Sequence, residues 1–461
     1  MMYRVPKEYM LRCAFPRGRV LRQVEDDLSI LTQFIVKFTP NESKEFDRLI
    51  DEEYGKMRSI SLKSIKNFRT EMTRLFGLIN VGENGVVTPS KRTELLVETQ
   101  NFPLFFKTFC HKFQFPNGIN KPQETIKFIE AGVHFEPAKF LLELFDLGVA
   151  RFGSAFCVDG TEISNLVFND SRVATGRRTA EEVLDVLVKL RNQRERFETG
   201  SKMVQHGREF LGYMFLAGLL IRDESGKFHL NETARTAIDF IKSDVEFFKV
   251  SEDFATDLSV RKQTLRDWWL WFGDVGETEK NKFAPGRVTS EEEIPELIET
   301  GIEVTPEMER AATPTRADMK EIGDKGELVV LKYERERVFR IRPDKVALVQ
   351  KVSNDTSLGY DIQSLELEDV TKKKYIEVKT TERTFPPSKD VLTYFRMSSN
   401  EWDTAKLFKE CYYIYRVFLT RDEASIFVIK DPAKKHKDGH ILLEALQYRV
   451  IVKETAGSYA K

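Results

Sequence analysis

The chain has 461 residues, and its formal net charge is only -1 although 31% of its residues are charged. This length allows two or three domains with a sizeable buried core, while the balanced charge gives no global sign of a polyanionic partner. The four cysteines stand far apart without any CxxC pair. That spacing argues against a zinc module or a disulfide scaffold and predicts a reducing, cytoplasmic compartment.

Several common motifs are absent from the sequence. It has no GxxxxGK[ST] segment and no GxGxxG segment opening a helix after a strand, which argues against an ATP-driven motor and a dinucleotide site. The longest apolar run, FLGYMFLAGLLI at 210–221, is too short to span a bilayer and predicts a buried helix. We therefore expect a protein that uses neither ATP nor a membrane.

The first half of the chain is rich in helical periodicity and contains a weak internal repeat. LFGLINVGENGVV (75–87) aligns with LAGLLIRDESGKF (216–228). Each copy predicts a helix ending at glycine, an apolar strand, a tight turn and a second strand, followed by another helix. This order favours two winged-helix subdomains, at 1–130 and 131–273, over unrelated hairpins in an α+β domain.

The composition changes after residue 273. Residues 274–320 are rich in Glu, Thr and Pro, which predicts an acidic linker with one short helix. Residues 321–461 predict a compact α/β domain. In this domain we expect helices in GELVVLKYERER and SSNEWDTAKLFKE, and strands around Val338–Ile341 and in GYDIQSLEL, KKKYIEVKTT, ECYYIYRVFLTRD and ASIFVIKD.

An acid and a base share one face of the strand predicted in KKKYIEVKTT, because Glu377 and Lys379 are two residues apart. Asp361 lies sixteen residues upstream, and Glu327 opens a predicted helix. A lone Glu-x-Lys on a strand is usually a solvated face. Two carboxylates on adjacent strands, however, suit a hard divalent cation, and a nearby ammonium can orient a water bound to it.

The order Glu327, Asp361, Glu377-Val378-Lys379 resembles the PD-(D/E)XK nuclease superfamily, in a subgroup related to Holliday-junction resolvases and restriction endonucleases. The resemblance covers about 321–461. It implies that Asp361 and Glu377 bind Mg²⁺, that Lys379 positions the hydrolytic water and that Glu327 assists. One departure is that Tyr360, not proline, precedes Asp361, and the superfamily often lacks that proline.

Basic residues gather in two places in the first half of the chain. They form a candidate DNA-binding set: Lys63, Lys66, Arg69, Arg74, Lys91, Arg92, Arg177 and Arg178. Such residues can hold phosphates or read base edges, but they can equally form solvated helix faces. The segments FRTEMTRLFGLI, TPSKRTELL and FFKTFCHKFQFPNG resemble the N-terminal DNA-recognition domain of the BpuJI family of type IIS restriction endonucleases. That resemblance covers roughly 10–245.

Together these features predict a multidomain protein with a mostly α-helical, winged-helix N-terminal half and an α/β PD-(D/E)XK domain. The expected function is a Mg²⁺-dependent type IIS restriction endonuclease that binds an asymmetric site in double-stranded DNA and cuts outside it. One active site per chain implies a second copy, at least transiently, for double-strand cleavage. Two alternatives stay open: a structure-selective nuclease of the junction-resolvase kind, and a DNA-binding regulator with an inert nuclease-like domain.

Overall fold

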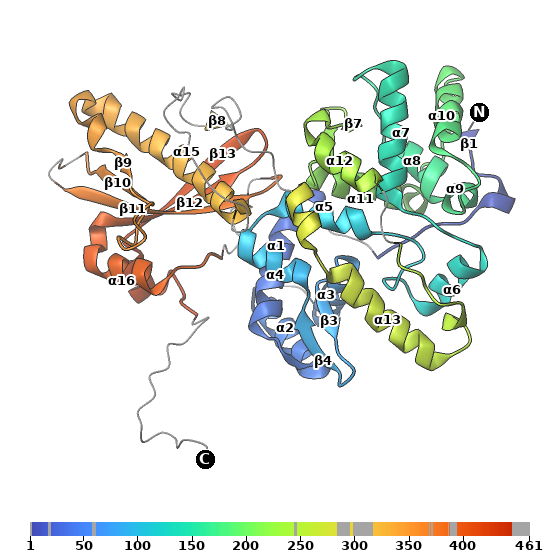
Figure 1. Ribbon diagram of the computed structural model, residues 1–461, viewed down its shortest axis with the longest axis horizontal. Coiled ribbons are helices and arrows are strands. Elements are labelled where there is room, and N and C mark those ends of the chain that lie inside the picture. Colours follow the sequence, from blue (N-terminus) through green and yellow to red (C-terminus); the bar gives the residue numbers. More distant parts are fainter. Residues whose placement is uncertain are drawn as a thin grey trace, which may run out of the picture.

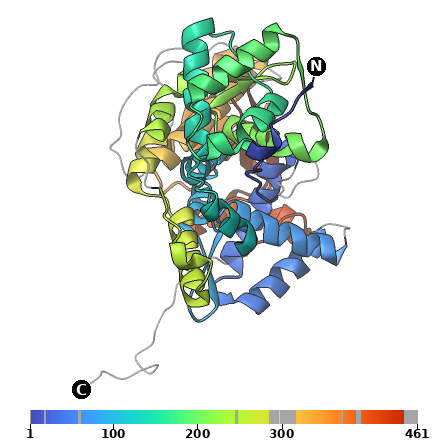
Figure 2. The ribbon, with the colours of Figure 1, turned by 90° about the vertical axis from the view of Figure 1, so that its right-hand side faces the viewer.

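The computed structural model describes residues 2–16, 20–57, 61–243, 247–283, 296–297, 317–367, 369, 372–385, 387 and 394–444. It has an N-terminal part, residues 2–283, and a C-terminal part built around one sheet (Figure 1). Figure 2 shows the helices of the N-terminal part in front of that sheet. Over these described ranges, every helix is too short or too polar to cross a membrane.

The N-terminal part is mostly helical, as the periodicity predicts. Its helices are α1 (Leu21–Lys37), α2 (Ser43–Met57), α3 (Leu62–Leu75), α4 (Lys91–Thr99), α5 (Phe102–Lys112), α6 (Pro122–Glu130), α7 (Pro137–Phe152), α8 (Gly160–Ile163), α9 (Ser171–Ala174), α10 (Ala180–Asn192), α11 (Ser201–Leu216), α12 (Arg235–Lys242), α13 (Leu258–Gly273) and α14 (Glu277–Phe283). Its strands are β1 (Met2–Tyr3), β2 (Asn41–Glu42), β3 (Ile79–Val81), β4 (Val86–Pro89), β5 (Arg196–Phe197), β6 (Leu220–Arg222) and β7 (Phe228–Leu230).

Both hairpins of the predicted repeat are present. Strands β3 and β4 pair antiparallel, and β2 completes a sheet of order β2-β4-β3. Strands β6 and β7 also pair antiparallel, and Val158 bridges to Phe228 beside them. Gly85 and Gly226 occupy equivalent turn positions with φ of 76° and 85°, a conformation that favours glycine. The sequence repeat is therefore a structural repeat of two helix-flanked hairpins.

One buried cluster of side chains runs through the whole N-terminal part, from Cys13 to Phe283. The expected boundary between residues 130 and 131 is crossed by backbone pairing between Phe115 and Phe135. The aromatic segment at 264–273 is helical as predicted, with Trp268 buried in this core. The two hairpin units thus share a single core.

Most of the predicted acidic linker lies outside the described residues. Helix α14, at its beginning, packs onto the N-terminal part, where Glu279 Oε1 lies 2.8 Å from His111 Nδ1 and Phe283 is fully buried. The two described residues of β8 pair with the C-terminal sheet.

The C-terminal part is a six-stranded mixed sheet of order β8-β13-β12-β11-β10-β9. Its elements are β8 (Glu296–Leu297), α15 (Ala317–Ile341), β9 (Gln350–Lys351), β10 (Ile362–Leu365), β11 (Lys373–Glu382), α16 (Ser399–Phe408), β12 (Tyr412–Leu419), β13 (Glu423–Lys430) and α17 (Pro432–Lys437). Strands β11 and β12 run parallel, whereas β10 and β13 flank them antiparallel. Helix α15 covers one face and α16 the other (Figure 1).

Alternation along β11 decides which side chain meets which helix. Ile376 and Val378 pack against Val329 and Val330 of α15, so the odd-numbered residues face the α16 side. Hence Glu377 and Lys379 lie on the face that α16 partly covers.

The prediction of a strand around Val338–Ile341 is wrong, because helix α15 continues through these residues. Basic and apolar residues alternate there, but the charges also suit a helix. Arg337 pairs with Glu334 and Arg340 with Glu336, at spacings of three and four residues. Local helical pairing therefore overrides the alternation.

A buried polar network fixes α15 to the sheet. Glu334, fully buried, accepts hydrogen bonds from Ser364 Oγ at 2.6 Å, Tyr415 Oη at 2.6 Å and Lys374 Nζ at 3.0 Å. Arg337 Nη2 donates to the same carboxylate at 2.7 Å. Each buried charge thus has a partner of opposite sign, as burial requires.

Candidate functional site

Asp361 and Glu377 lie opposite each other on the C-terminal sheet. Asp361 directly precedes β10, and its N–H donates to Ile376 O at 2.9 Å. Since Ile362 pairs with Ile376, the antiparallel register places Asp361 across from Glu377, so both side chains project to one face. The N–H of Val378 donates to Asp361 Oδ2 at 2.7 Å and orients that carboxylate.

Lys379 joins this pair from the same strand. Its Nζ lies 2.6 Å from Glu377 Oε1 and 2.9 Å from Oε2 of Glu401, in the first turn of α16. The Lys379 side chain is 18% exposed and that of Glu377 is 4% exposed. The group is thus largely withdrawn from water but open at one edge.

Burial and crowding of negative charge disfavour ionisation of the two carboxyls. Burial, with the charge of Glu327 next, raises the pKa of Asp361 to about 7. Burial also raises the pKa of Glu377 well above its ordinary value, although Lys379 opposes the shift. The pKa of Lys379 is raised, because Glu377 and Glu401 outweigh the opposing effect of burial. An added cation beside Asp361 and Glu377 would favour their charged forms.

Glu327 adjoins the group from α15. Its Oε2 accepts from Ser353 Oγ at 2.6 Å and lies 2.9 Å from Lys351 Nζ. Its charge acts on Asp361, yet its direct partners are these two residues. The structure therefore brings Asp361, Glu377 and Lys379 together and sets Glu327 beside them.

The donor set fits Mg²⁺. In the described part of the chain, no three His, Cys, Asp or Glu side chains form a group that could hold a metal. Mg²⁺ commonly binds proteins through one or two carboxylates and completes its shell with water and substrate phosphate. Asp361 and Glu377 supply two such oxygen donors, so metal binding by this pair stays a prediction that the geometry allows.

Two residues of the site, Glu401 and Lys351, were not predicted from the sequence. Glu401 pairs with Lys379, and Lys351 pairs with Glu327. The Ser398-Ser-Asn-Glu401 segment carried a visible signal, the capping-box pattern of a helix start. Lys351 stands on the two-residue strand β9 and carried no comparable signal.

Five of the eight predicted DNA-contacting cations are exposed. Lys63, Lys66 and Arg74 lie on α3, and Lys91 opens α4 directly after the β3–β4 hairpin. Arg177 is also exposed, in the turn before α10.

The remaining three cations have internal partners. Arg92 is fully buried and donates to Phe76 O, Thr108 O and Thr108 Oγ1. Arg69 is bound by Asp47 and Asp51. Arg178 Nη1 lies 2.8 Å from the buried Asp170. We therefore leave Arg69, Arg92 and Arg178 out of the proposed DNA-contacting set, because their guanidinium groups stabilise the fold.

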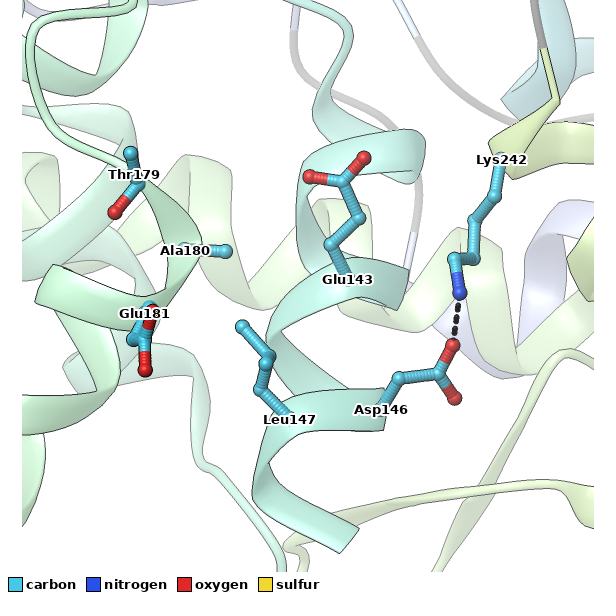
Figure 3. A pocket seen from close by; sticks show the side chains of 7 residues that line it. All are labelled: Glu143, Asp146, Leu147, Thr179, Ala180, Glu181 and Lys242. Carbon is cyan, nitrogen blue, oxygen red and sulfur yellow. Dashed lines mark hydrogen bonds and ion pairs between the residues drawn. The ribbon is translucent and has the colours of Figure 1, made fainter. Parts of the chain in front are cut away.

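A surface hollow of about 370 Å³ lies elsewhere, between α7, α10 and α12 (Figure 3). Its lining includes Glu143, Asp146 and Glu181, and Lys242 bonds to Asp146. This acidic lining would repel a phosphate. The carboxylate and lysine group on the C-terminal sheet is the better candidate for chemistry.

Comparison with solved structures defines the class of the N-terminal part. The chain is similar to a structure described as "Crystal structure of pyrene- and phenanthrene-modified DNA in complex with the BpuJ1 endonuclease binding domain", with a TM-score of 0.52 and 24% identity. The match covers 59% of this chain and 100% of that one, and shows a shared fold. Residues 3–269, more than half of the chain, match the family model for the N-terminal region of restriction endonuclease BpuJI. The chain belongs to that family.

The C-terminal part has different relatives. Residues 326–429 match the family model for the C-terminal region of protein NO VEIN. The chain is 31% identical to protein NO VEIN of Arabidopsis thaliana over 134 residues and 32% identical to protein NO VEIN-LIKE of the same plant over 127 residues. These segments cover 29% and 28% of this chain but only 4% and 18% of the two relatives.

Proposed function

We propose that the chain is a Mg²⁺-dependent, sequence-specific DNA endonuclease of the type IIS restriction class. The observation that carries the proposal is the grouping of Asp361, Glu377 and Lys379 on one sheet face. This grouping occurs in a chain whose other part belongs to the BpuJI N-terminal family.

The N-terminal part would bind duplex DNA. The relative of matching fold was crystallised in complex with modified DNA. The order α1-β2-α2-α3-β3-β4, with sheet order β2-β4-β3, supports a winged-helix reading. In such a unit, α3 would enter the major groove and present Lys63, Lys66 and Asn67, which are exposed.

The C-terminal part would be the nuclease. The order of α15, β10, β11, α16 and β12 in a mixed sheet supports the PD-(D/E)XK assignment. Asp361 and Glu377 would hold Mg²⁺, with Glu327 assisting through its charge on Asp361. When bound, the ion would neutralise charge on the phosphate and acidify a water ligand.

The reaction would be hydrolysis of a phosphodiester: a water oxygen forms a bond to phosphorus while one P–O ester bond breaks. Lys379 would donate hydrogen bonds to the attacking water or to a phosphate oxygen and so align them. One such group per chain cuts one strand, so a second copy would cut the other. Recognition by one part and chemistry by another would place the cut outside the recognised sequence.

The decisive experiment is to incubate the purified chain with unmethylated phage DNA and Mg²⁺ and to sequence the fragment ends. Discrete ends at a fixed offset from a shared sequence are expected. Asp361→Asn and Lys379→Met should abolish cleavage while DNA binding persists. Lys373→Ala, an exposed position on the same strand, is the matched control. Random ends, or full activity in the first two variants, would refute the proposal.

The likeness to protein NO VEIN favours a second candidate, a DNA-binding regulator whose nuclease-like part is inert. The matched residues, 326–429, include Asp361, Glu377 and Lys379. Tight binding to one duplex sequence, without cutting of linear or branched DNA at any Mg²⁺ concentration, would support the regulator.

A further inference from the structure

Glu401 holds a fixed place at the start of α16. Ser398 caps the helix: its Oγ accepts the Glu401 N–H at 3.2 Å, and its own N–H donates to Glu401 Oε2 at 3.0 Å. This reciprocal pair is a capping box. The capping box therefore orients the Glu401 carboxylate from within its own helix.

The same oxygen, Glu401 Oε2, also accepts a hydrogen bond from Lys379 Nζ at 2.9 Å. The ammonium thus lies between two carboxylates, Glu377 on its own strand and Glu401 on the covering helix. A lysine side chain has many rotamers, and a second anchor restricts them.

The two carboxylates differ in their proposed roles. Glu377 is a proposed Mg²⁺ ligand, and a bound cation would repel an ammonium held by the same carboxylate. Glu401 has no such proposed role, so it can keep its contact with Lys379 when the ion is present. We propose that Glu401 is the positioning residue that holds the Lys379 ammonium beside the reacting phosphate; this rests on the proposed nuclease function.

A simpler role for Glu401 is helix capping alone, and one substitution separates the two roles. Glutamine also serves at this position of a capping box. Glu401→Gln therefore keeps the start of α16 but removes the negative charge next to Lys379. A cap alone predicts wild-type cleavage by this variant, whereas positioning predicts a slower reaction.

The first test measures cleavage of a duplex that carries the recognised site. Glu401→Gln is expected to lower kcat about tenfold or more, because the lysine loses its fixed position, with the KM for DNA unchanged, because the residue touches no DNA in this scheme. Asp403→Asn, on the same helix and ion-paired with Lys406, is the matched control and should cleave at the wild-type rate. Wild-type kcat in Glu401→Gln would overturn the proposal.

The second test needs neither metal nor cleavage. Thermal unfolding of Lys379→Met, Glu401→Gln and the double variant gives a coupling between the two side chains. Non-additive shifts in Tm are expected, and additive shifts would overturn the positioning role. If the wild-type chain cuts no DNA, the nuclease function fails, while this cycle still decides whether Glu401 holds Lys379.

Discussion

Asp26 of α1 and Arg383, the first residue after β11, form a buried ion pair between the two parts of the molecule. Beside them, both oxygens of the fully buried Glu25 accept backbone N–H groups, from Thr384 at 2.7 Å and Phe385 at 3.1 Å. Strand β11 carries Glu377 and Lys379. The strand of the candidate site is thus attached directly to the family domain.

Because the Asp26–Arg383 pair is buried, removing either partner should strongly lower the free energy of unfolding. Asp26→Asn or Arg383→Met removes one member of this buried ion pair, and Glu25, whose Oε2 lies 3.7 Å from Arg383 Nε, compensates only in part, so the fold should lose about 3–5 kcal/mol of stability. Chemical denaturation measures the change. Arg48→Met removes the exposed ion pairs with Glu45 and Glu52 and should lower stability far less. Equal effects at the buried and exposed pairs would contradict the assigned role.

The Glu334 network predicts a specific dependence of stability on pH. Burial alone would raise the pKa of Glu334, but Lys374 and Arg337 lower it below the ordinary value of 4.5. A carboxyl with a lowered pKa in the folded state stabilises the fold above pH 4.5, and this contribution is lost as the pH falls through the lowered pKa. Glu334→Gln lacks this titration. The Tm advantage of wild type over Glu334→Gln should be largest near neutral pH and shrink below about pH 4.5.

The close contact between α15 and β11 at Gly326 predicts that a methyl group added there will lower the Tm. A Cβ at this position would overlap the side chain of Thr380, so Gly326→Ala must shift either Thr380 or the helix. We expect a lower Tm and, under the proposed function, slower cleavage, because Glu327 follows directly. Gly323→Ala, on the same helix with open space around it, should change Tm little or raise it. The same loss in both variants would show that helix propensity, not close contact, is responsible.

Exposed lysines of α3 should contribute to DNA affinity and not to stability. Lys63→Ala and Lys66→Ala are expected to weaken DNA binding at unchanged Tm. Each should reduce the slope of log affinity against log salt by about 1 if the lysine contacts a phosphate. Fluorescence anisotropy over a salt series measures the affinity and its salt slope, and thermal unfolding measures the Tm. An unchanged slope in both variants would remove α3 from the proposed interface.

Arg92 should behave in the opposite way. Arg92→Met deprives the buried Phe76 O and Thr108 O of a donor, which should cost at least about 2 kcal/mol of stability. The affinity of the folded fraction for DNA should equal that of wild type. A loss of affinity without a loss of Tm would restore Arg92 to the DNA-contacting set.

Local signals predicted much of this molecule. Glycines at helix ends and turns located both hairpins, because these positions need a left-handed backbone. Alternation along KKKYIEVKTT located β11 and placed Glu377 and Lys379 on one face. The adjacency of Asp361 and Glu377 followed from the expected order of two neighbouring strands.

Long-range and cooperative features were not predictable in this way. Lys91 and Arg92 are adjacent cations, yet one is exposed and the other fully buried, because burial depends on the packing of α5 and α13 around α4. The burial of Glu25 and Asp26 depends on partners more than 350 residues away in the sequence, Arg383 and Thr384. The contact between Glu401 and Lys379 depends on how α16 covers the sheet.

The short stretch of chain between the candidate site on β11 and the buried ion pair limits how the parts of this protein can be exchanged with those of a relative. Arg383 follows Lys379 by four positions, about 13 Å of extended chain. A deletion or insertion of one residue there would turn Arg383 to the opposite side of the strand, away from its acidic partners. A family domain taken from a relative would have to carry matching acids at the positions of Glu25 and Asp26. A chimaera joined only through residues 284–316 would lack this attachment.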